Sequence, residues 1–293
     1  MKNVLAATDF SASAHFALER AAQIARASGA ALNLLHVPRQ GRWAQGAGVF
    51  SQVFGDGNAP SLDDDRERLE KTAGALAKRF RVHAECHVVP GKVAQTEIAR
   101  FASAREIDLV VLGTRGDGGL MPAAVGGTAL KVLWRSLSPV LLVREPVQAA
   151  YHRVLVATDL GERAVKVAGT AASMFPKASI VLVHAFRAGH EGALELLGAD
   201  AQALADYRAE EGIAAAARLE SFWREVRGAS RRRAVELLAH GHPVPVVLEA
   251  VAEYAPDLVV LGKHAGRRWQ ERVLGSVVQN LLQRLGTDVL VVP

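Results

Sequence analysis

Cysteine, aromatic residues and long apolar runs are all scarce in this sequence. Cys86 is the single cysteine of the 293 residues, so no internal disulfide forms, which is typical of proteins from reducing compartments. Apolar runs such as Val289 to Val292 are far shorter than the roughly 20 residues that cross a bilayer. Aromatic residues make up 5% of the chain, which offers few platforms for stacking nucleic-acid bases. These shortages exclude a disulfide-rich miniature protein and membrane-spanning helices.

The charge balance and the N-terminus narrow the class further. Thirty-five basic and 30 acidic residues give a formal net charge of +5, and the densest basic run is Arg231 to Arg233. Because that run is short and opens a predicted strand, the sequence argues against nucleic acid as a partner. Met1 to Val4 lead directly into a strand, which leaves no space for an apolar signal segment. We therefore expect a globular cytoplasmic protein that makes no membrane contact.

The order of signals in the first half of the chain recurs in the second half. Val4 to Phe10 matches Val154 to Leu160 at an offset of 154 − 4 = 150 residues, and Asp108 to Gly113 matches Asp257 to Gly262 at 257 − 108 = 149. This offset is far longer than the roughly 20 to 50 residues of solenoid repeats, so it indicates a duplicated domain. We expect a first domain at residues 1–145, a linker at 146–150 and a second domain at 151–293.

Each half alternates short apolar runs with longer stretches of helical periodicity, which predicts beta-alpha-beta units. Runs such as Leu109 to Leu112 show no polar alternation, as is typical of parallel strands covered on both faces. In the first half we expect strands at residues 2–8, 31–37, 82–89, 108–113 and 140–143. The expected helices follow Ser11 and lie at about 62–79, 94–104 and 128–136, and the second half has a longer second helix at about 199–227. The predicted fold class is α/β, with two tandem doubly wound domains, each a five-stranded parallel sheet flanked by helices.

Glycine-rich loops follow the fourth predicted strand of each half. Glycine lets the backbone approach an anion closely, and a helix N-terminus presents free amides and a partial positive charge. The loops therefore suit a phosphate group. The first contains Gly113, Arg115, Gly116, Gly126, Gly127 and Thr128, and the second contains Gly262, Lys263, Ala265, Gly266, Gly275, Ser276 and Val277.

An aspartate ends the first strand of each half, at Asp9 and Asp159. In a doubly wound sheet the loops after strands one and four meet where the strand order reverses. A carboxylate there can accept hydrogen bonds from a ribose or an adenine. It can equally cap the following helix, and both roles stay open.

These residues resemble the universal stress protein family, and the resemblance covers nearly the whole chain as two family domains in tandem. Nucleotide-binding members share a glycine, two residues, a glycine, nine residues, and a glycine followed by serine or threonine. Gly113, Gly116 and Gly126 keep this spacing, but Gly127 stands at the hydroxyl position and Thr128 comes one residue late. In the second half Gly262, Gly275 and Ser276 fit, whereas Ala265 replaces the second glycine and Gly266 follows one residue late.

The resemblance implies a Rossmann-like, adenine nucleotide alpha hydrolase-like fold, with ATP as the ligand, with or without Mg²⁺. It would place adenine near Ala7 and Val37 in the first half, and near Ala157 and Ala185 in the second. It also implies that the fifth strands of the two halves pair, which would make the chain an intrachain pseudo-dimer. Whether the chain forms a homodimer in addition stays open.

The expected function is a stress-response protein that binds ATP or a related adenine nucleotide in at least one domain and regulates a protein partner. Nucleotide-dependent ordering of the loops at 38–60 and 117–125 would be its mechanism. The sequence has neither a Walker-type loop nor a spaced Ser-His-Asp set, so we expect no dedicated enzyme and at most slow ATP hydrolysis.

Two alternatives to nucleotide binding stay open. One is a nucleotide-free interaction scaffold, because both motifs depart from the family pattern. The other is a carrier of another small ligand, with an apolar cleft near residues 193–204. His83 and His87, on either side of Cys86, and the pair His240 and His242 are candidate metal ligands. Strand alternation puts His83 and His87 on the face opposite Cys86, so we expect no metal site there.

Overall fold

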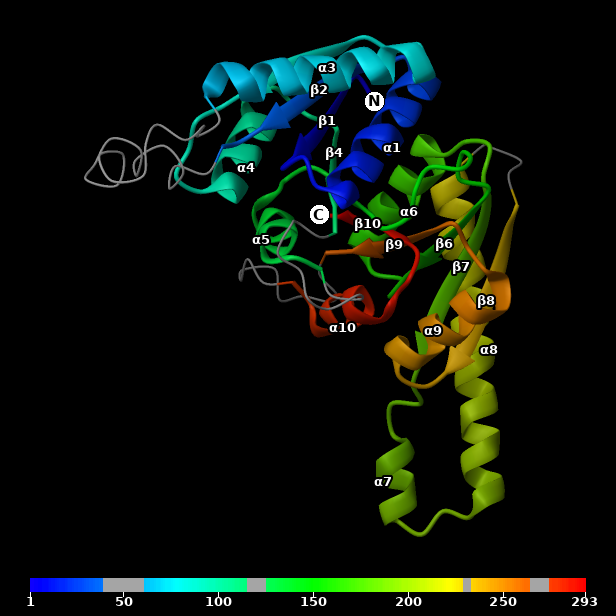
Figure 1. Ribbon diagram of the computed structural model, residues 1–293. Helices are drawn as coiled ribbons and strands as arrows, with labels where there is room; N and C mark the ends of the chain where they lie inside the picture. The colour runs from blue at the N-terminus through cyan, green and yellow to red at the C-terminus, as the bar shows by residue number, and fades with distance from the viewer. Residues whose placement is uncertain (39–60, 115–124, 229–232, 264–273) are drawn as a thin grey trace, which may run out of the picture. The chain divides into compact units, whose positions relative to one another are not determined.

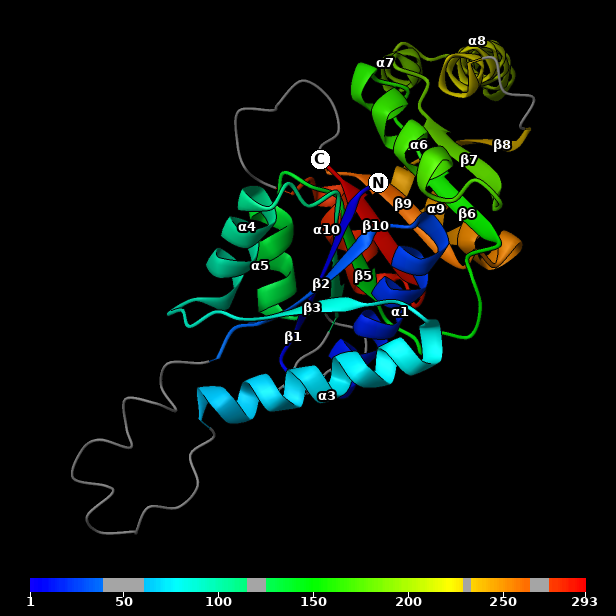
Figure 2. The ribbon, with the colours of Figure 1, turned by 90° about the horizontal axis from the view of Figure 1, so that it is seen from above.

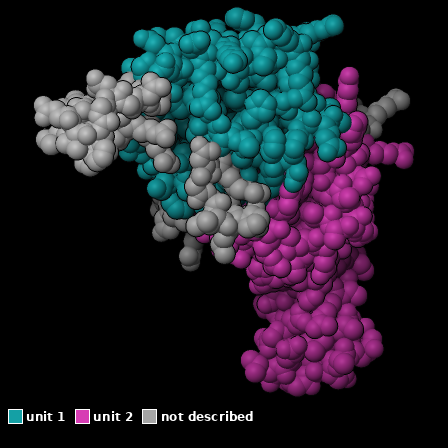
Figure 3. All heavy atoms as spheres, in the orientation of Figure 1, with its two compact units in different colours: residues 1–150 teal, residues 151–293 magenta. Residues whose placement is uncertain are grey.

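The computed structural model describes residues 1–38, 61–114, 125–228, 233–263 and 274–293. The chain divides into two compact units, Met1–Ala150 and Tyr151–Pro293, which we call unit 1 and unit 2 (Figure 3). Both are α/β units with a parallel sheet between helices, in agreement with the predicted fold class.

Unit 1 has five parallel strands in the order β3-β2-β1-β4-β5. The strand order reverses beside β1, which lies between β2 and β4. The strands are β1 (Asn3–Thr8), β2 (Ala31–His36), β3 (Ala84–Val88), β4 (Leu109–Gly113) and β5 (Val140–Val143). The helices are α1 (Ala12–Ser28), α3 (Leu62–Phe80), α4 (Ala94–Ala104) and α5 (Gly127–Arg135).

Unit 2 repeats this arrangement with the strand order β8-β7-β6-β9-β10. Its strands are β6 (Arg153–Ala157), β7 (Ser179–Phe186), β8 (Ala234–His240), β9 (Leu258–Gly262) and β10 (Asp288–Val292). Its helices are α6 (Glu162–Met174), α7 (Glu191–Leu196), α8 (Ala201–Arg227), α9 (Pro243–Tyr254) and α10 (Ser276–Arg284).

Helices cover both faces of each sheet (Figures 1 and 2). In unit 1, α1 packs with α3 on one face and α4 packs with α5 on the other. In unit 2 the corresponding pairs are α6 with α8 and α9 with α10. The middle of each central strand is therefore apolar: every residue from Val4 to Ala6 and from Leu109 to Val111 is 0% exposed. No helix among the described residues is long and apolar enough to cross a membrane.

Local sequence signals explain where the first helix begins and ends. The Ser11 hydroxyl accepts a hydrogen bond from the Ala14 N–H, which satisfies one free amide of the first turn of α1. Gly29 then adopts a left-handed φ of 69° and ends the helix. The start of α1 after Ser11 agrees with the sequence prediction.

A duplicated aspartate fixes the start of the first strand in each unit. Asp108 Oδ2 accepts the Asn3 N–H at 2.9 Å, and Asp257 Oδ2 accepts the Arg153 N–H at 2.8 Å. Burial, the largest single cause, raises the pKa of Asp108, but hydrogen bonds from Lys2 and Asn3 and the positive charges of the N-terminus and Lys2 together outweigh it, so the net shift is downward. These contacts lie at the amino end of the sheet, away from the candidate site.

The largest departure from the repeat lies between β7 and β8. The single expected helix at about 199–227 is preceded by a separate short helix, α7, joined to α8 by a tight turn (Figure 1). Helix α7 buries none of its residues, and Leu196 and Leu197 are 91% and 84% exposed. This segment therefore does not enclose the apolar cleft considered for a ligand carrier.

Candidate functional site

The first strand of each unit ends in the same hydrogen-bonded turn. In unit 1 the Phe10 N–H donates to Thr8 Oγ1 at 2.9 Å, and the Ser11 N–H donates to Asp9 Oδ1 at 3.1 Å. In unit 2 the Leu160 N–H donates to Thr158 Oγ1 at 3.0 Å, and the Gly161 N–H donates to Asp159 Oδ1 at 3.0 Å. The aspartate thus braces the turn before the helix while its side chain stays exposed at the carboxyl end of the sheet.

This turn holds a non-glycine residue in the left-handed region in both units. The φ angle is 64° at Phe10 and 59° at Leu160. Residues other than glycine, asparagine and aspartate rarely adopt this conformation. The flanking threonine and aspartate hydrogen bonds hold it there. Residues in sparsely populated φ regions cluster at functional sites, so the repeated turn is consistent with a site here, although Glu106 and Ala255 form a second such pair at helix ends.

A histidine at the end of the second strand contacts the same turn. His36 Nδ1 lies 2.8 Å from the Thr8 carbonyl oxygen, and His184 Nδ1 lies 2.9 Å from that of Thr158. Because a carbonyl oxygen only accepts, Nδ1 carries the proton and donates in both units. Nε2 is thereby directed away from the strand pair. The sequence contained this pair as a repeated landmark but gave it no role.

The surroundings of the two histidines differ. In unit 1 the Asp65 carboxylate of α3 lies 3.5 Å from His36 Nε2, and the Arg68 guanidinium lies 4.3 Å from the centre of the Phe10 ring. In unit 2 the His184 pKa is lowered, chiefly by burial and further by Arg218 of α8. The Thr158 hydrogen bond and Asp159 oppose this shift.

In each unit, one backbone hydrogen bond joins the two ends of the glycine-rich loop, which we call the loop root. The Gly126 N–H donates to the Thr114 carbonyl at 2.7 Å, and the Gly275 N–H donates to the Lys263 carbonyl at 3.3 Å. The loop therefore closes directly onto the end of the fourth strand. Arg115, Gly116, Ala265 and Gly266, which were predicted to bind the ligand, lie outside the described residues.

Gly113 is required by packing at the root of the first loop. A Cβ atom added there would lie 2.6 Å from the Ser13 carbonyl oxygen, in the first turn of α1. No side chain fits at that distance, so glycine allows the end of β4 to meet the helix that follows β1. This contact brings the two predicted halves of the unit 1 site, the aspartate turn and the loop, side by side.

The helix after each loop begins at a glycine cap without a side-chain hydrogen bond, at Gly126 and Gly275. Gly127 is the first residue of α5 and Thr128 the second, whereas Ser276 is the first residue of α10 and Val277 the second. One residue along a helix is a rotation of about 100°, so Thr128 does not present its hydroxyl where Ser276 does. Hence unit 2 alone has a hydroxyl at the first helical position.

Two buried polar residues lie where the fourth strand ends, and the sequence reasoning identified only the second. Thr114 is 1% exposed, and its Oγ1 has no hydrogen-bond partner among the described residues. Lys263, its counterpart in unit 2, is 7% exposed. The Lys263 carbonyl accepts the Gly275 N–H, so a basic residue and the free amides at the start of α10 belong to the same loop root, and both favour an anion.

The predicted adenine positions lie at the same carboxyl end of each sheet. Ala7 is 8% exposed and pairs with Leu35, two residues before Val37. Ala157 ends β6, and Ala185 follows His184 on β7. All four have small or apolar side chains that are at least half buried.

The histidines considered as metal ligands have other partners. His87 contacts Asn33 Oδ1 at 3.1 Å, and its ring lies 4.8 Å from that of Phe101 on α4. His240 Nε2 lies 3.0 Å from Glu191 Oε2, and His242 Nδ1 accepts the Val244 N–H at the start of α9. Within the described ranges, no group of three or more potential ligand residues has a metal-binding arrangement.

Comparison with known proteins decides the family. A model of the universal stress protein family matches residues 1–144 and again residues 150–293. The chain belongs to the universal stress protein family. It carries two family domains in tandem, as the sequence resemblance predicted.

Relatives and solved structures agree with this assignment. Universal stress protein YxiE of Bacillus subtilis is 31% identical over 150 residues, which cover 48% of this chain and 97% of that protein. Universal stress protein MJ0531 of Methanocaldococcus jannaschii is 28% identical over 110 residues, 38% of this chain, and the match spans 57% of its length.

Two solved structures are similar along the whole chain. A universal stress protein from Archaeoglobus fulgidus is 18% identical with a TM-score of 0.68, over 99% of this chain and 97% of that one. A functionally unknown protein from Pseudomonas aeruginosa is 16% identical with a TM-score of 0.69, over 100% and 92%. At these identities the similarity shows the fold alone.

Proposed function

We propose that this chain binds ATP or a related adenine nucleotide in at least one unit and acts as a nucleotide-dependent regulator, with ATP hydrolysis slow at most. The observation that carries the proposal is the convergence, in both units, of a strained aspartate turn and a loop that leads into a helix N-terminus. These features lie where the strand order reverses, which is where doubly wound sheets bind ligands.

The residues of this end of the sheet fit such a ligand. The amides at the start of α5 and α10 would donate to phosphate oxygens, and Lys263 would add positive charge in unit 2. Asp9 and Asp159 would accept from sugar hydroxyls with the carboxylate capacity that the turn does not use. When bound with the nucleotide, Mg²⁺ would neutralise phosphate charge.

Unit 2 is the stronger candidate for the occupied site. It has the Ser276 hydroxyl at the first position of α10 and the buried Lys263, whereas unit 1 has Gly127 and Thr114 at these places. One hydrogen bond to a charged group contributes about 1.5 to 3 kcal/mol, which is roughly a tenfold or larger change in affinity. The loops proposed to order on binding lie almost entirely outside the described residues.

The first experiment is native mass spectrometry of the purified chain before and after denaturation, followed by calorimetric titration with ATP and Mg²⁺. One or two equivalents of released or titrated nucleotide per chain are expected. If no nucleotide is released and no heat of binding is measured, the proposal is wrong, and the nucleotide-free scaffold replaces it.

A further inference from the structure

Strand β3 is the terminal strand of the unit 1 sheet among the described residues, and its backbone polarity can be assigned. The Val89 N–H donates to the His36 carbonyl of β2 at 3.0 Å. The N–H and C=O groups of successive strand residues point to opposite sides, so residues two apart share a side. Glu85 and His87, like Val89, therefore direct their N–H and C=O groups toward β2. The N–H and C=O groups of Ala84, Cys86 and Val88 therefore point to the outer edge.

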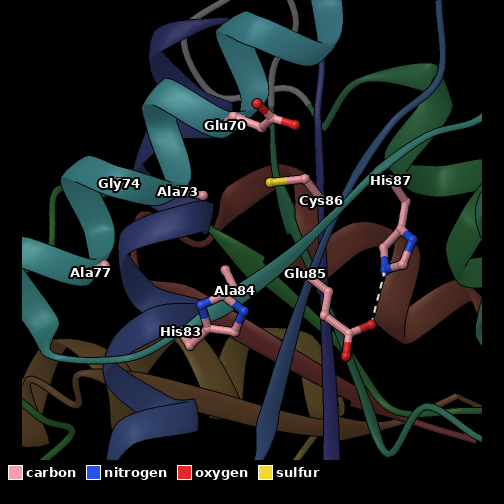
Figure 4. A pocket seen from close by; sticks show the side chains of 9 residues that line it. All are labelled: Glu70, Ala73, Gly74, Ala77, His83, Ala84, Glu85, Cys86 and His87. Carbon is pink, nitrogen blue, oxygen red and sulfur yellow. Dashed lines mark ion pairs between the residues drawn. The ribbon is translucent and has the colours of Figure 1, made fainter.

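A groove of about 580 Å³ runs along this outer edge, between β3 and α3 (Figure 4). Its α3 wall is made of small residues, Ala73, Gly74 and Ala77, below Glu70. Small side chains on the covering helix leave the outer backbone groups of the strand open to a further strand. An edge of this kind is a ready template for strand addition.

The side chains of β3 separate onto two faces. Cys86 is directed toward α3 and Glu70, and burial, followed by the Glu70 charge, raises the pKa of its thiol (Figure 4). Glu85 and His87 lie on the α4 face, 3.7 Å apart, and Arg105 lies 3.5 Å from Glu85. The strand therefore has a neutral face toward α3 and a mixed-charge face toward α4.

The strand sequence complements itself when two copies pair antiparallel about Cys86. Glu85 of each copy then lies opposite His87 of the other, which gives two such pairs. Ala84 of each copy likewise lies opposite Val88 of the other. Opposite-charge or hydrogen-bonding cross-strand pairs stabilise a sheet, whereas like charges destabilise it. A pairing centred on Glu85 would instead place two carboxylates face to face, so the register about Cys86 is the favoured one.

We propose that the outer edge of β3 is an interface for a second copy of this chain, which adds its own β3 antiparallel about Cys86. The Glu85 side chain, 57% exposed in a single chain beside its own His87 and Arg105, would in this arrangement also lie opposite the partner copy's imidazole. The interface does not involve the carboxyl end of the sheet, so it does not depend on whether nucleotide binds.

Light scattering coupled to gel filtration tests the proposal on the full chain. The expected mass is twice the 31.2 kDa of one chain. Val88→Pro removes one outward N–H without removing a bond to β2, and we expect it to weaken the dimer at least tenfold. A monomeric parent chain, or a dimer unaffected by Val88→Pro, overturns the proposal.

The matched control is Glu236→Pro on β8, the terminal strand of unit 2. The Gly241 N–H donates to the Phe186 carbonyl, so Glu236 likewise directs its N–H away from β7. This variant should remain dimeric. Loss of the dimer in Glu236→Pro but not in Val88→Pro would place the interface on the other edge and overturn the assignment.

Crosslinking of the unaltered chain provides a test that needs no variant to fold. Because Cys86 is the only cysteine, a bis-maleimide joins two chains only through their Cys86 thiols. The paired Cα atoms would lie about 5.5 Å apart, so a short linker at about pH 8.5 should join nearly all chains. A dimer by mass that the short linker fails to join overturns the proposed register.

Discussion

The carboxyl ends of the two sheets have the same backbone and different side chains. Both units hold a threonine-aspartate turn, a histidine that donates to the threonine carbonyl, and a loop closed by one backbone hydrogen bond. The side chains around this frame differ: Asp65 faces His36, whereas Arg218 and Asp159 are the charged neighbours of His184. The two units thus share the backbone arrangement at this end of the sheet. They differ in the side chains that would meet a ligand.

One aligned position accounts for much of the difference. Leu69 of α3 and Leu219 of α8 are both buried and differ by 219 − 69 = 150 positions, the offset of the first strands. The same offset aligns Asp65 with Ala215, which is 0% exposed. Unit 2 therefore lacks the helix carboxylate that lies beside the histidine in unit 1, whereas the basic residue is kept at the aligned positions Arg68 and Arg218.

The largest expected effect concerns the hydroxyl that distinguishes α10 from α5. Ser276→Gly should lower the ATP affinity of unit 2 by about 10- to 100-fold, because a hydrogen bond to phosphate is lost. Gly127→Ser should raise the affinity of unit 1, and a Cβ at 127 has no atom of the described residues within 4 Å. Calorimetric titration with ATP measures both, and unchanged affinity in both variants would contradict a role for this position.

Packing at the loop root gives the next largest effect. Gly113→Ala forces a Cβ against the Ser13 backbone and should destabilise unit 1 by about 1–3 kcal/mol. Gly127→Ala is the control, because it adds the same methyl group at the start of α5, where no described atom lies within 4 Å of it. Urea unfolding followed by circular dichroism compares them. Equal stability of the two variants would show that the backbone around Gly113 and Ser13 shifts to admit the methyl group without a loss of stability.

The pair formed by His36 and Asp65 should give a smaller coupling. A double-mutant cycle with His36→Asn and Asp65→Asn is expected to show about 0.5–1 kcal/mol of interaction free energy, since the pair is mostly shielded from solvent. The same cycle with Asp63→Asn, a 90% exposed carboxylate in the first turn of α3, should show none. Coupling as large for Asp63 would mean that the effect is general to the helix.

The smallest expected effect is a pH dependence specific to unit 2. Burial lowers the pKa of His184 below its unfolded value, so the unfolded state binds more protons as the pH falls. Stability is then complete above about pH 6.5 and is lost below it. His184→Asn keeps a donor near the Thr158 carbonyl and should flatten the decline of thermal stability between about pH 7 and 5.

His87 sets the baseline of that experiment. Its pKa is also lowered, chiefly by burial, so a residual slope should persist in the His184→Asn variant. An unchanged slope would mean that protonation of His184 does not couple to unfolding.

Periodicity and turn residues predicted most of this architecture. The ten strands expected from two five-stranded sheets are present, and α4 and β5 begin and end at the expected residues. These elements have strong local signals, since buried parallel strands are apolar throughout and helix ends carry caps. Strand β3 is shorter than the expected 82–89 because it lies at the sheet edge, where only one neighbour fixes its ends.

The candidate site was predictable only in part, because its contacts join residues far apart in sequence. The glycines and the two aspartates were visible as a spaced motif. The contact between Asp65 and His36 and the buried Thr114 carry no local signal, since they depend on how α3 and β4 pack. Helix α7 was missed because six residues are too few to show helical periodicity.

Because Gly113 packs closely against Ser13, we expect the base of the loop and the first turn of α1 to move together. A rigid contact transmits displacement, so a ligand that shifts the end of β4 must also shift the start of α1. The His15 N–H donates to the Ser11 carbonyl at 3.0 Å in this first turn, and we expect its hydrogen exchange to change when a ligand occupies the loop. Its rate of hydrogen exchange would report binding without a label at the site.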